Sequence, residues 1–154
     1  LTEITIPNSV TSIGHRAFKD CSALTKIVIS ESVTWIGWWV FFGCSALDNI
    51  VVEDGNTTYD SRENCNAIIE TKTNTLIRGG SQTIIPNSVT KIGEFAFKDC
   101  SALKEITIPE SVMEIDGCAF EGCTALKTIY LPRKVEYYKG LLSEEWHDKI
   151  VEVE

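Results

Sequence analysis

Hydrophobic residues recur along the chain in a pattern of 23 residues. Residues 1–23 read LTEITIPNSVTSIGHRAFKDCSA, and residues 24–46 read LTKIVISESVTWIGWWVFFGCSA. Residues 103–125 are a third copy, and residues 83–102 are most of a fourth that lacks the opening Leu. A fixed period of this length is typical of repeat proteins, in which each repeat is one structural unit that stacks on the next. The pattern therefore predicts one turn of a solenoid per repeat.

Each repeat opens with alternating hydrophobic residues that predict a short strand. The alternation occurs in residues 4–6, 27–29, 106–108 and 129–131, and a period of two is that of a β-strand with one inward face. Stacked repeats would pair these strands into a parallel sheet. Four prolines, Pro7, Pro86, Pro109 and Pro132, follow the strand positions, where the missing amide hydrogen ends the pairing.

The second half of each repeat predicts a corner and an inward ring. A further extended segment, residues 10–13, leads to glycines at positions 14, 37 and 93, and a positive φ at these glycines would suit a tight corner. An Ala-Phe pair such as Ala17-Phe18 then predicts a brief helical turn. We expect each repeat to add one Phe to a central stack.

The middle of the chain departs from the repeat. Residues 47–52 still follow the strand template, but Asp54-Gly55-Asn56 reads as a turn. Residues 67–70 and 75–78 then flank a polar loop, a pattern that predicts a β-hairpin. We expect this hairpin to be an insertion on the flank of the solenoid; the alternative is a lateral contact surface.

The C-terminal residues predict a cap. Leu142, Trp146 and Ile150 are spaced four apart within residues 136–150, so a helix there would turn one apolar stripe to the last repeat. The whole chain, residues 1–154, is thus predicted as a single α/β, β-rich domain. It comprises repeats at 1–23 and 24–46, divergent repeats with the insertion at 47–102, a repeat at 103–125, and a C-terminal repeat with the cap at 126–154.

The repeat resembles the BspA-like, or Treponema pallidum-type, leucine-rich repeat, whose unit is close to LxxIxIPxSVTxIGxxAFxxCxx. The resemblance covers about four-fifths of the chain. It implies a right-handed solenoid of the kind found in surface-exposed or secreted proteins, often linked to adhesion to host proteins or other cells. It does not imply a particular ligand.

Charge and hydropathy narrow the classes of partner. The chain has 22 acidic against 14 basic residues and a net charge of -8, which repels phosphate backbones and anionic lipids. No run of apolar residues is long enough for a membrane-spanning helix. Because the chain opens on a repeat and without Met, we expect it to be part of a longer array. We expect no binding of nucleic acid and no membrane insertion.

The chain offers little that predicts catalysis or a metal. Four of the six cysteines, Cys21, Cys44, Cys100 and Cys123, share one repeat position, so stacking predicts a ladder of buried thiols; disulfides between neighbours in the ladder are the alternative. His15 and His147 belong to no catalytic motif. Oxygen-bearing residues within 54–63 fail the spacing of a calcium loop. We expect no enzyme activity, no cofactor and no metal.

One repeat alone carries a set of aromatic residues on its outer positions. The first repeat has Ser12, His15, Arg16 and Lys19 at these positions, and the second has Trp35, Trp38, Trp39 and Phe42. An exposed cluster of large rings is typical of a protein interface. These four residues are the candidate binding site; the alternative is that they pack beneath the hairpin.

The sequence therefore predicts a non-catalytic binding or adhesion module of a bacterial surface or secreted protein, with an extracellular or cell-surface location. Its partner would be a protein, such as a host or cell-surface protein, or a second copy of the chain. The alternatives are spacer repeats in a longer surface array, or an engineered repeat scaffold with an aromatic patch.

Overall fold

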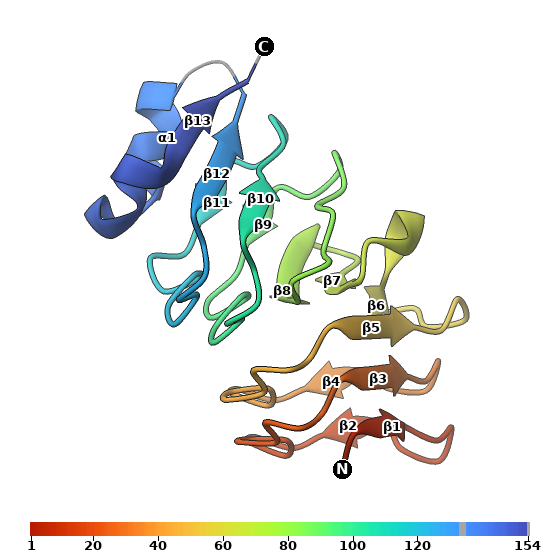
Figure 1. The fold of residues 1–154 in the computed structure, drawn as a ribbon. Coiled ribbons are helices and arrows are strands. Elements are labelled where there is room, and N and C mark those ends of the chain that lie inside the picture. Colours follow the sequence, from red (N-terminus) through yellow and green to blue (C-terminus); the bar gives the residue numbers. More distant parts are fainter. Residues whose placement is uncertain (133–134, 154) are drawn as a thin grey trace.

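The computed structural model, which describes residues 1–132 and 135–153, is a β-rich solenoid of stacked coils (Figure 1). The coils follow the repeats: the first is 1–23, the second 24–46, the third 47–82, the fourth 83–102, the fifth 103–125, and the last is described over 126–132 with the cap at 135–153. The elements are β1 (Glu3–Thr5), β2 (Ser12–Ile13), β3 (Lys26–Ile29), β4 (Trp35–Ile36), β5 (Asn49–Val52), β6 (Tyr59–Asp60), η1 (Arg62–Asn64), β7 (Ala67–Glu70), β8 (Thr75–Gly79), β9 (Lys91–Ile92), β10 (Glu105–Thr107), β11 (Glu114–Ile115), β12 (Thr128–Leu131), α1 (Val135–Leu141), η2 (Glu144–Lys149) and β13 (Ile150–Glu152).

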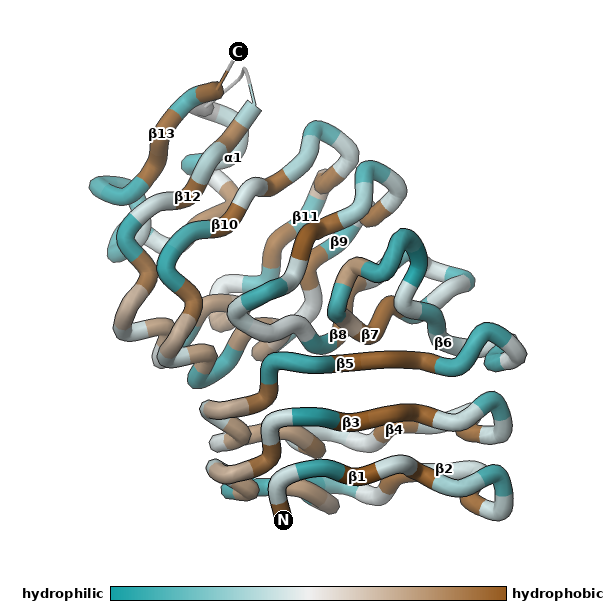
Figure 2. Tube along the Cα trace, turned by 45° about the vertical axis from the view of Figure 1, so that its right-hand side comes forward, coloured by the Kyte–Doolittle hydropathy of each residue, from teal (hydrophilic) through white to brown (hydrophobic). Residues whose placement is uncertain are grey.

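The strands that open the coils form two parallel sheets rather than the one expected. The first has the order β1-β3-β5 and the second β10-β12-β13. Pairing keeps the repeat register, with Ile4 opposite Ile27 and Ile27 opposite Ile50, so hydrophobic positions of successive coils lie one above another (Figure 2). The expectation of one sheet is wrong because the fourth coil has no strand before Pro86. There the side chain of Ile84 is 78% exposed, and its amide donates to the carbonyl of Cys65 at 3.1 Å.

Side chains replace the missing neighbour along the outer edge of β5. The amide of Ile50 donates to Oδ1 of Asn66 at 2.7 Å, and the amide of Val52 donates to Oγ of Ser61 at 2.9 Å. An unpaired buried amide costs free energy comparable to a lost hydrogen bond. The polar residues of the third coil therefore end the first sheet without leaving these two donors unsatisfied.

The predicted hairpin is present, but it lies inside the solenoid and not on its flank. Strands β7 and β8 pair antiparallel within a few residues of the expected bounds, and β8 continues into a parallel pair with β9 of the fourth coil. Ile68, Ile69 and Leu76 are fully buried. A hairpin that is hydrophobic on both faces has to be covered on both. It lies between the second and fourth coils, and the neighbouring coils cover its two faces (Figure 1).

This hairpin separates two hydrophobic cores. Alternation along β7 sends Ile68 into the core of the first three coils and Ile69 into the core of the later coils. Leu76 joins Ile69, while Ile77 packs against the same core as Ile68. The ring of Phe18 stacks on Phe41 with centroids 6.0 Å apart, and Phe97 stacks on Phe120 at 5.3 Å. The expected single Phe stack is thus two separate pairs.

The corners of the coils are built differently from the prediction. Where a helical turn was expected, the structure has a series of hydrogen-bonded turns. The φ angle is positive at Arg16 (59°), Trp39 (57°) and Phe95 (57°), which occupy the same position in three coils. Positive φ is absent from Gly14, Gly37 and Gly93. Gly37 serves close packing instead, because a Cβ there would lie 2.7 Å from the amide nitrogen of His15.

The C-terminal cap consists of two short helices and a strand. Helix α1 and the 3-10 helix η2 are separated at Leu142 and Ser143, and β13 adds parallel to β12. The expected single helix is therefore wrong, although Leu142 and Trp146 are buried as expected and Ile150 packs against them. Within the described residues, no helix has the length and apolar character needed to cross a bilayer.

The thiol ladder is a set of free cysteines, of which Cys44, Cys100 and Cys123 bond through Sγ to backbone carbonyls of the preceding coil. The Sγ atoms of Cys44 and Cys123 each lie 3.0 Å from a carbonyl oxygen, those of Phe18 and Phe97 respectively. Burial raises the pKa of Cys44 from 9.0 to about 11 and that of Cys123 to about 12. Cys21 is half-buried and Cys118, outside the ladder, is exposed.

We predict that Ile68→Ala and Ile69→Ala each lower the free energy of unfolding by about 2–4 kcal/mol, because each leaves a cavity in a different core. Urea denaturation followed by circular dichroism measures this. Lys72→Ala, at the exposed tip of the hairpin, serves as the control and should leave the midpoint unchanged. A hairpin that merely decorated the flank would give small effects for all three substitutions.

We also predict a loss of stability in alkaline solution that depends on the ladder. The thiols of Cys44 and Cys123 ionise at higher pH when folded than when unfolded, so their contribution is complete below pH 9 and declines as pH rises toward 11. The urea midpoint of the wild type should fall more steeply between pH 9 and pH 11 than that of Cys44→Ala/Cys123→Ala. Parallel pH curves for the two proteins would contradict the prediction.

Candidate binding groove

Three tryptophans of the second coil are exposed on the surface. The exposed fraction is 45% for Trp35, 75% for Trp38 and 45% for Trp39, while Phe42 is half-buried. They occupy β4 and the turn that follows it, where the equivalent residues of the first coil also face outward. The structure contradicts the alternative in which the hairpin covers these tryptophans. The hairpin packs beneath the turn and leaves its outer rings uncovered.

The first coil holds the patch in place through polar and ring contacts. Nδ1 of His15 accepts a hydrogen bond from the amide of Trp38 at 2.8 Å, and the His15 ring meets Trp35 edge-on with centroids 5.0 Å apart. The guanidinium carbon of Arg16 lies 4.7 Å from the ring centroid of Trp39. An exposed cation over an aromatic face contributes about 0.5–1 kcal/mol. These contacts orient the tryptophans before any partner arrives.

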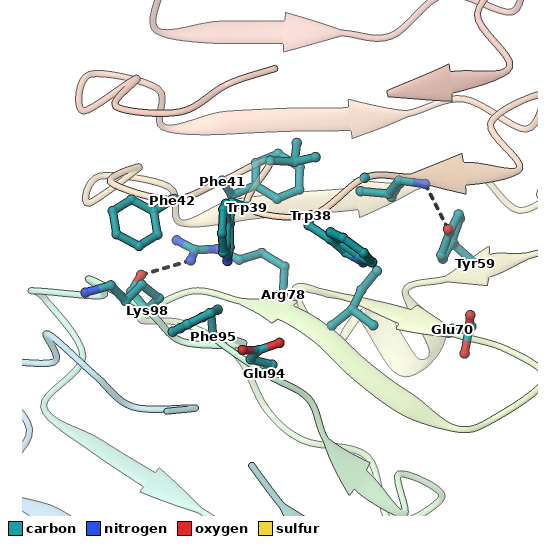
Figure 3. Close-up of a pocket in the computed structure, with 14 residues that line it drawn as sticks. Trp38, Trp39, Phe41, Phe42, Tyr59, Glu70, Arg78, Glu94, Phe95 and Lys98 are labelled. Atoms are coloured by element: carbon teal, nitrogen blue, oxygen red, sulfur yellow. Dashed lines mark hydrogen bonds between the residues drawn. The ribbon is translucent and has the colours of Figure 1, made fainter. Parts of the chain in front are cut away.

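A groove of about 410 Å³ opens between the second and fourth coils (Figure 3). One wall is the turn of the second coil, residues 36–42, and the other wall is the turn of the fourth coil; the hairpin forms the floor. The remaining lining residues are Tyr59, Glu70, Ile77, Arg78, Glu94, Phe95 and Lys98. We refer to this hollow as the aromatic groove. It exists because the third coil places its hairpin inward and provides no turn at this level.

Three of the four predicted site residues, Trp38, Trp39 and Phe42, line the aromatic groove, whereas Trp35 lies outside it. Sequence reasoning missed Phe95, whose ring meets Phe42 edge-on at 6.4 Å across the groove. Phe95 occupies the same repeat position as Trp39. That shared position was the signal that could have identified it, once the second and fourth coils were known to face each other.

The floor of the groove contains a buried arginine that joins its two walls. The guanidinium of Arg78 donates to the carbonyl of Lys98 at 2.9 Å and to the carbonyl of Cys44 at 3.2 Å. The side chain is 3% exposed, and its Nε has no hydrogen-bond partner among the described residues. Arg78 thus replaces part of the backbone pairing that a regular third coil would provide.

A lysine beside the floor remains charged. Burial lowers the pKa of Lys98, but hydrogen bonds to Asp99 and Glu121 outweigh this effect and raise the pKa above its ordinary value. Nζ lies 3.1 Å from each of these carboxylates and 4.9 Å from the ring centroid of Phe42. The groove is therefore bordered by a fixed cation as well as by rings.

The other polar candidates are engaged in structural bonds. The side-chain Nδ2 of Asn56 donates to the carbonyls of Ser30 and Val33, each at 2.9 Å. Burial raises the pKa of Asp60, but hydrogen bonds from Arg62 and Thr71 outweigh it and lower the pKa below its ordinary value. In the described part of the chain, no three His, Cys, Asp or Glu side chains are placed to hold a metal ion.

Comparisons with solved structures identify the fold. The chain is similar to a leucine-rich repeat protein from Eubacterium ventriosum (23% identity, TM-score 0.60) and to the pneumococcal vaccine antigen PcpA (22%, TM-score 0.65), each over 86% of this chain and 42% of the other. It is also similar to a leucine-rich cell surface protein from Faecalibacterium prausnitzii, with 26% identity and a TM-score of 0.54. That match covers 100% of this chain and 53% of the other.

The chain thus spans about half the length of these solved relatives or less. No curated protein sequence matches it significantly. The model of the BspA type leucine rich repeat region matches residues 1–78 and 79–141, in 6 copies. Together with the 23-residue register and the parallel coils, this match shows that the chain belongs to the BspA-type leucine-rich repeat family.

Proposed function

We propose that this chain is part of a non-catalytic protein-binding module of a bacterial cell-surface or secreted protein, and that the aromatic groove is its contact surface. The observation that carries the proposal is the exposure of Trp38 and Trp39 at 75% and 45% on the wall of a 410 Å³ groove. Tryptophan at the centre of a concave apolar surface is the commonest anchor of protein interfaces.

Energetics favour a partner over an uncovered surface. Fully covering an exposed large ring contributes up to about 1.5–3 kcal/mol, so several neighbouring rings offset part of the cost of association. The fixed contacts of His15 and Arg16 reduce the entropy lost on binding, because the rings are already oriented. A coil that served only as a spacer would gain nothing from exposed tryptophans. The other coils have mainly polar or small residues at the equivalent positions.

The class of partner follows from charge and from relatives. A chain with a net charge of -8 disfavours nucleic acid and anionic membranes, which leaves proteins, including host proteins, other surface proteins and a second copy of the chain. A surface or secreted location is supported by the similar Faecalibacterium prausnitzii protein, which is described as a cell surface protein. Binding through a preformed surface needs no cofactor.

The test is a pair of substitutions taken from sister coils. Trp38→Glu and Trp39→Arg install the residue types of positions 94 and 16, and Arg16 already adopts the same positive φ as Trp39. The double variant should keep the wild-type unfolding midpoint, yet bind at least about thirtyfold more weakly to partners selected from a displayed library of extracellular proteins. Surface plasmon resonance measures the binding, and light scattering measures self-association.

The control variant replaces two exposed apolar side chains outside the groove and makes the same change in charge as the tryptophan variant. Ile84→Glu and Met113→Lys lie outside the groove and are 78% and 60% exposed in the wild type. This control should bind as the wild type does. Equal binding by the tryptophan variant, or no partner from the library together with a monomer at high concentration, would show that the proposal is wrong.

A further inference from the structure

Backbone hydrogen bonds join the turns of neighbouring coils. The amides of Arg16, Phe18 and Asp20 donate to carbonyls of the second coil at 2.7–3.1 Å. The same bonds recur between the fourth and fifth coils, where the amides of Phe97 and Asp99 donate at 2.8 and 2.9 Å. Each coil therefore presents donors, two residues apart, to the coil that follows.

The second coil presents these donors to the aromatic groove. The amides of Trp39, Phe41 and Gly43 occupy the equivalent positions, and within the described residues they make no hydrogen bond. Their backbone has the same form as that of the first coil, with a φ of 57° at Trp39 against 59° at Arg16. Since the equivalent amides of the first coil point to the next coil, these three point to the same side of the second coil, where Trp39 and Phe41 line the groove and Gly43 follows them.

Within the described residues, the chain itself leaves this set of donors unpaired. The turn of the fifth coil also lacks a following turn, but there the cap covers it, with Trp146 packed edge-on against Phe120 at 6.2 Å. Arg78 reaches the second coil at the carbonyl of Cys44, an acceptor, and its buried Nε is itself an unpaired donor among the described residues. An occupant of the groove that supplies acceptors would therefore find unpaired backbone donors.

Beside these amides lies a hollow of about 260 Å³ with a positive lining. It is lined by Arg16, Lys19, Trp39, Phe42 and Phe95; no carboxylate lines it, although Lys19 also pairs at its surface with the exposed Asp20 at 3.7 Å. Nζ of Lys19 lies 5.8 Å from the ring centroid of Phe42, so both cations rest on aromatic faces. In a chain whose net charge is -8, this local surface complements an acidic side chain.

We propose that the aromatic groove binds an extended acidic segment of a partner protein, whose alternate carbonyls pair with the amides of Trp39, Phe41 and Gly43. An acidic side chain of that segment lies between Arg16 and Lys19. An extended chain presents carbonyls on one edge at every second residue, and these donors are likewise two residues apart in the sequence. This inference rests on the proposed function and specifies the chemistry of its partner.

The first test is a titration with a fluorescein-labelled, acetylated octapeptide of alternating Leu and Glu, followed by anisotropy. The wild type should bind it, and Arg16→Glu/Lys19→Glu should bind roughly tenfold more weakly because two attractive charges are reversed. The matched control, Lys104→Glu/Lys127→Glu, makes the same change in net charge at exposed sites outside the hollow. It should retain the wild-type affinity.

Two further probes test the sign of the charge that binds and the class of polymer that carries it. The same peptide with Lys in place of Glu should not bind, and a labelled oligo-dT should not bind. Absence of binding by the Leu-Glu peptide would overturn the inference. It would also be overturned if both double variants lost affinity equally, or if oligo-dT bound more tightly than the peptide with the same dependence on Arg16 and Lys19.

Amide hydrogen exchange measured by NMR tests the backbone pairing directly. Saturation with the peptide should slow exchange at Trp39, Phe41 and Gly43 about tenfold or more, while the already bonded amides of Phe18 and Phe97 remain unchanged. Unchanged exchange at the three groove amides would overturn the pairing. If Trp38→Glu/Trp39→Arg abolishes binding of a selected protein while the peptide fails to bind, only this inference falls and the proposed function stands.

Discussion

Each coil can bury its hydrophobic face only against the next coil, and the fixed spacing of 23 residues makes that stacking regular. Equivalent residues then lie opposite each other, as Ile4, Ile27 and Ile50 do, and one set of backbone bonds repeats from coil to coil. Any segment that departs from the spacing has to replace both the apolar contacts and the backbone partners. The third coil is where this happens.

The third coil replaces some of these partners with side chains. Asn66 and Ser61 accept hydrogen bonds from the last strand of the first sheet, and Arg78 bonds to a carbonyl on either side of the break. The hairpin replaces the apolar contacts. Neither these polar side chains nor the hairpin reaches the outer half of the turn that holds Trp38 and Trp39, and the aromatic groove lies there. The candidate site thus results from an incomplete replacement of the regular coil contacts.

Sequence patterns predicted what is local or periodic. The repeat gave the strands, the thiol ladder and the outward position of the tryptophans, and alternation gave the hairpin nearly to the residue. The residue pattern could not predict where the hairpin lies, because two apolar faces on a strand do not indicate which surfaces will cover them. For the same reason Phe95 was missed, since its proximity to Phe42 depends on how the coils close around the hairpin. The cap was misjudged because pairing of β13 with β12 is nonlocal.

Two adjacent residues, Ile68 and Ile69, are anchored in different cores. The hairpin therefore contributes side chains to both cores and acts as a joint between the two halves of the stack. Repeat proteins unfold in units set by the coupling between neighbours, so the strength of this joint decides whether the chain unfolds as one unit or as two. The aromatic groove opens at the joint. A ligand that spans its walls would brace the two halves, which links occupancy of the surface to the cooperativity of the whole solenoid.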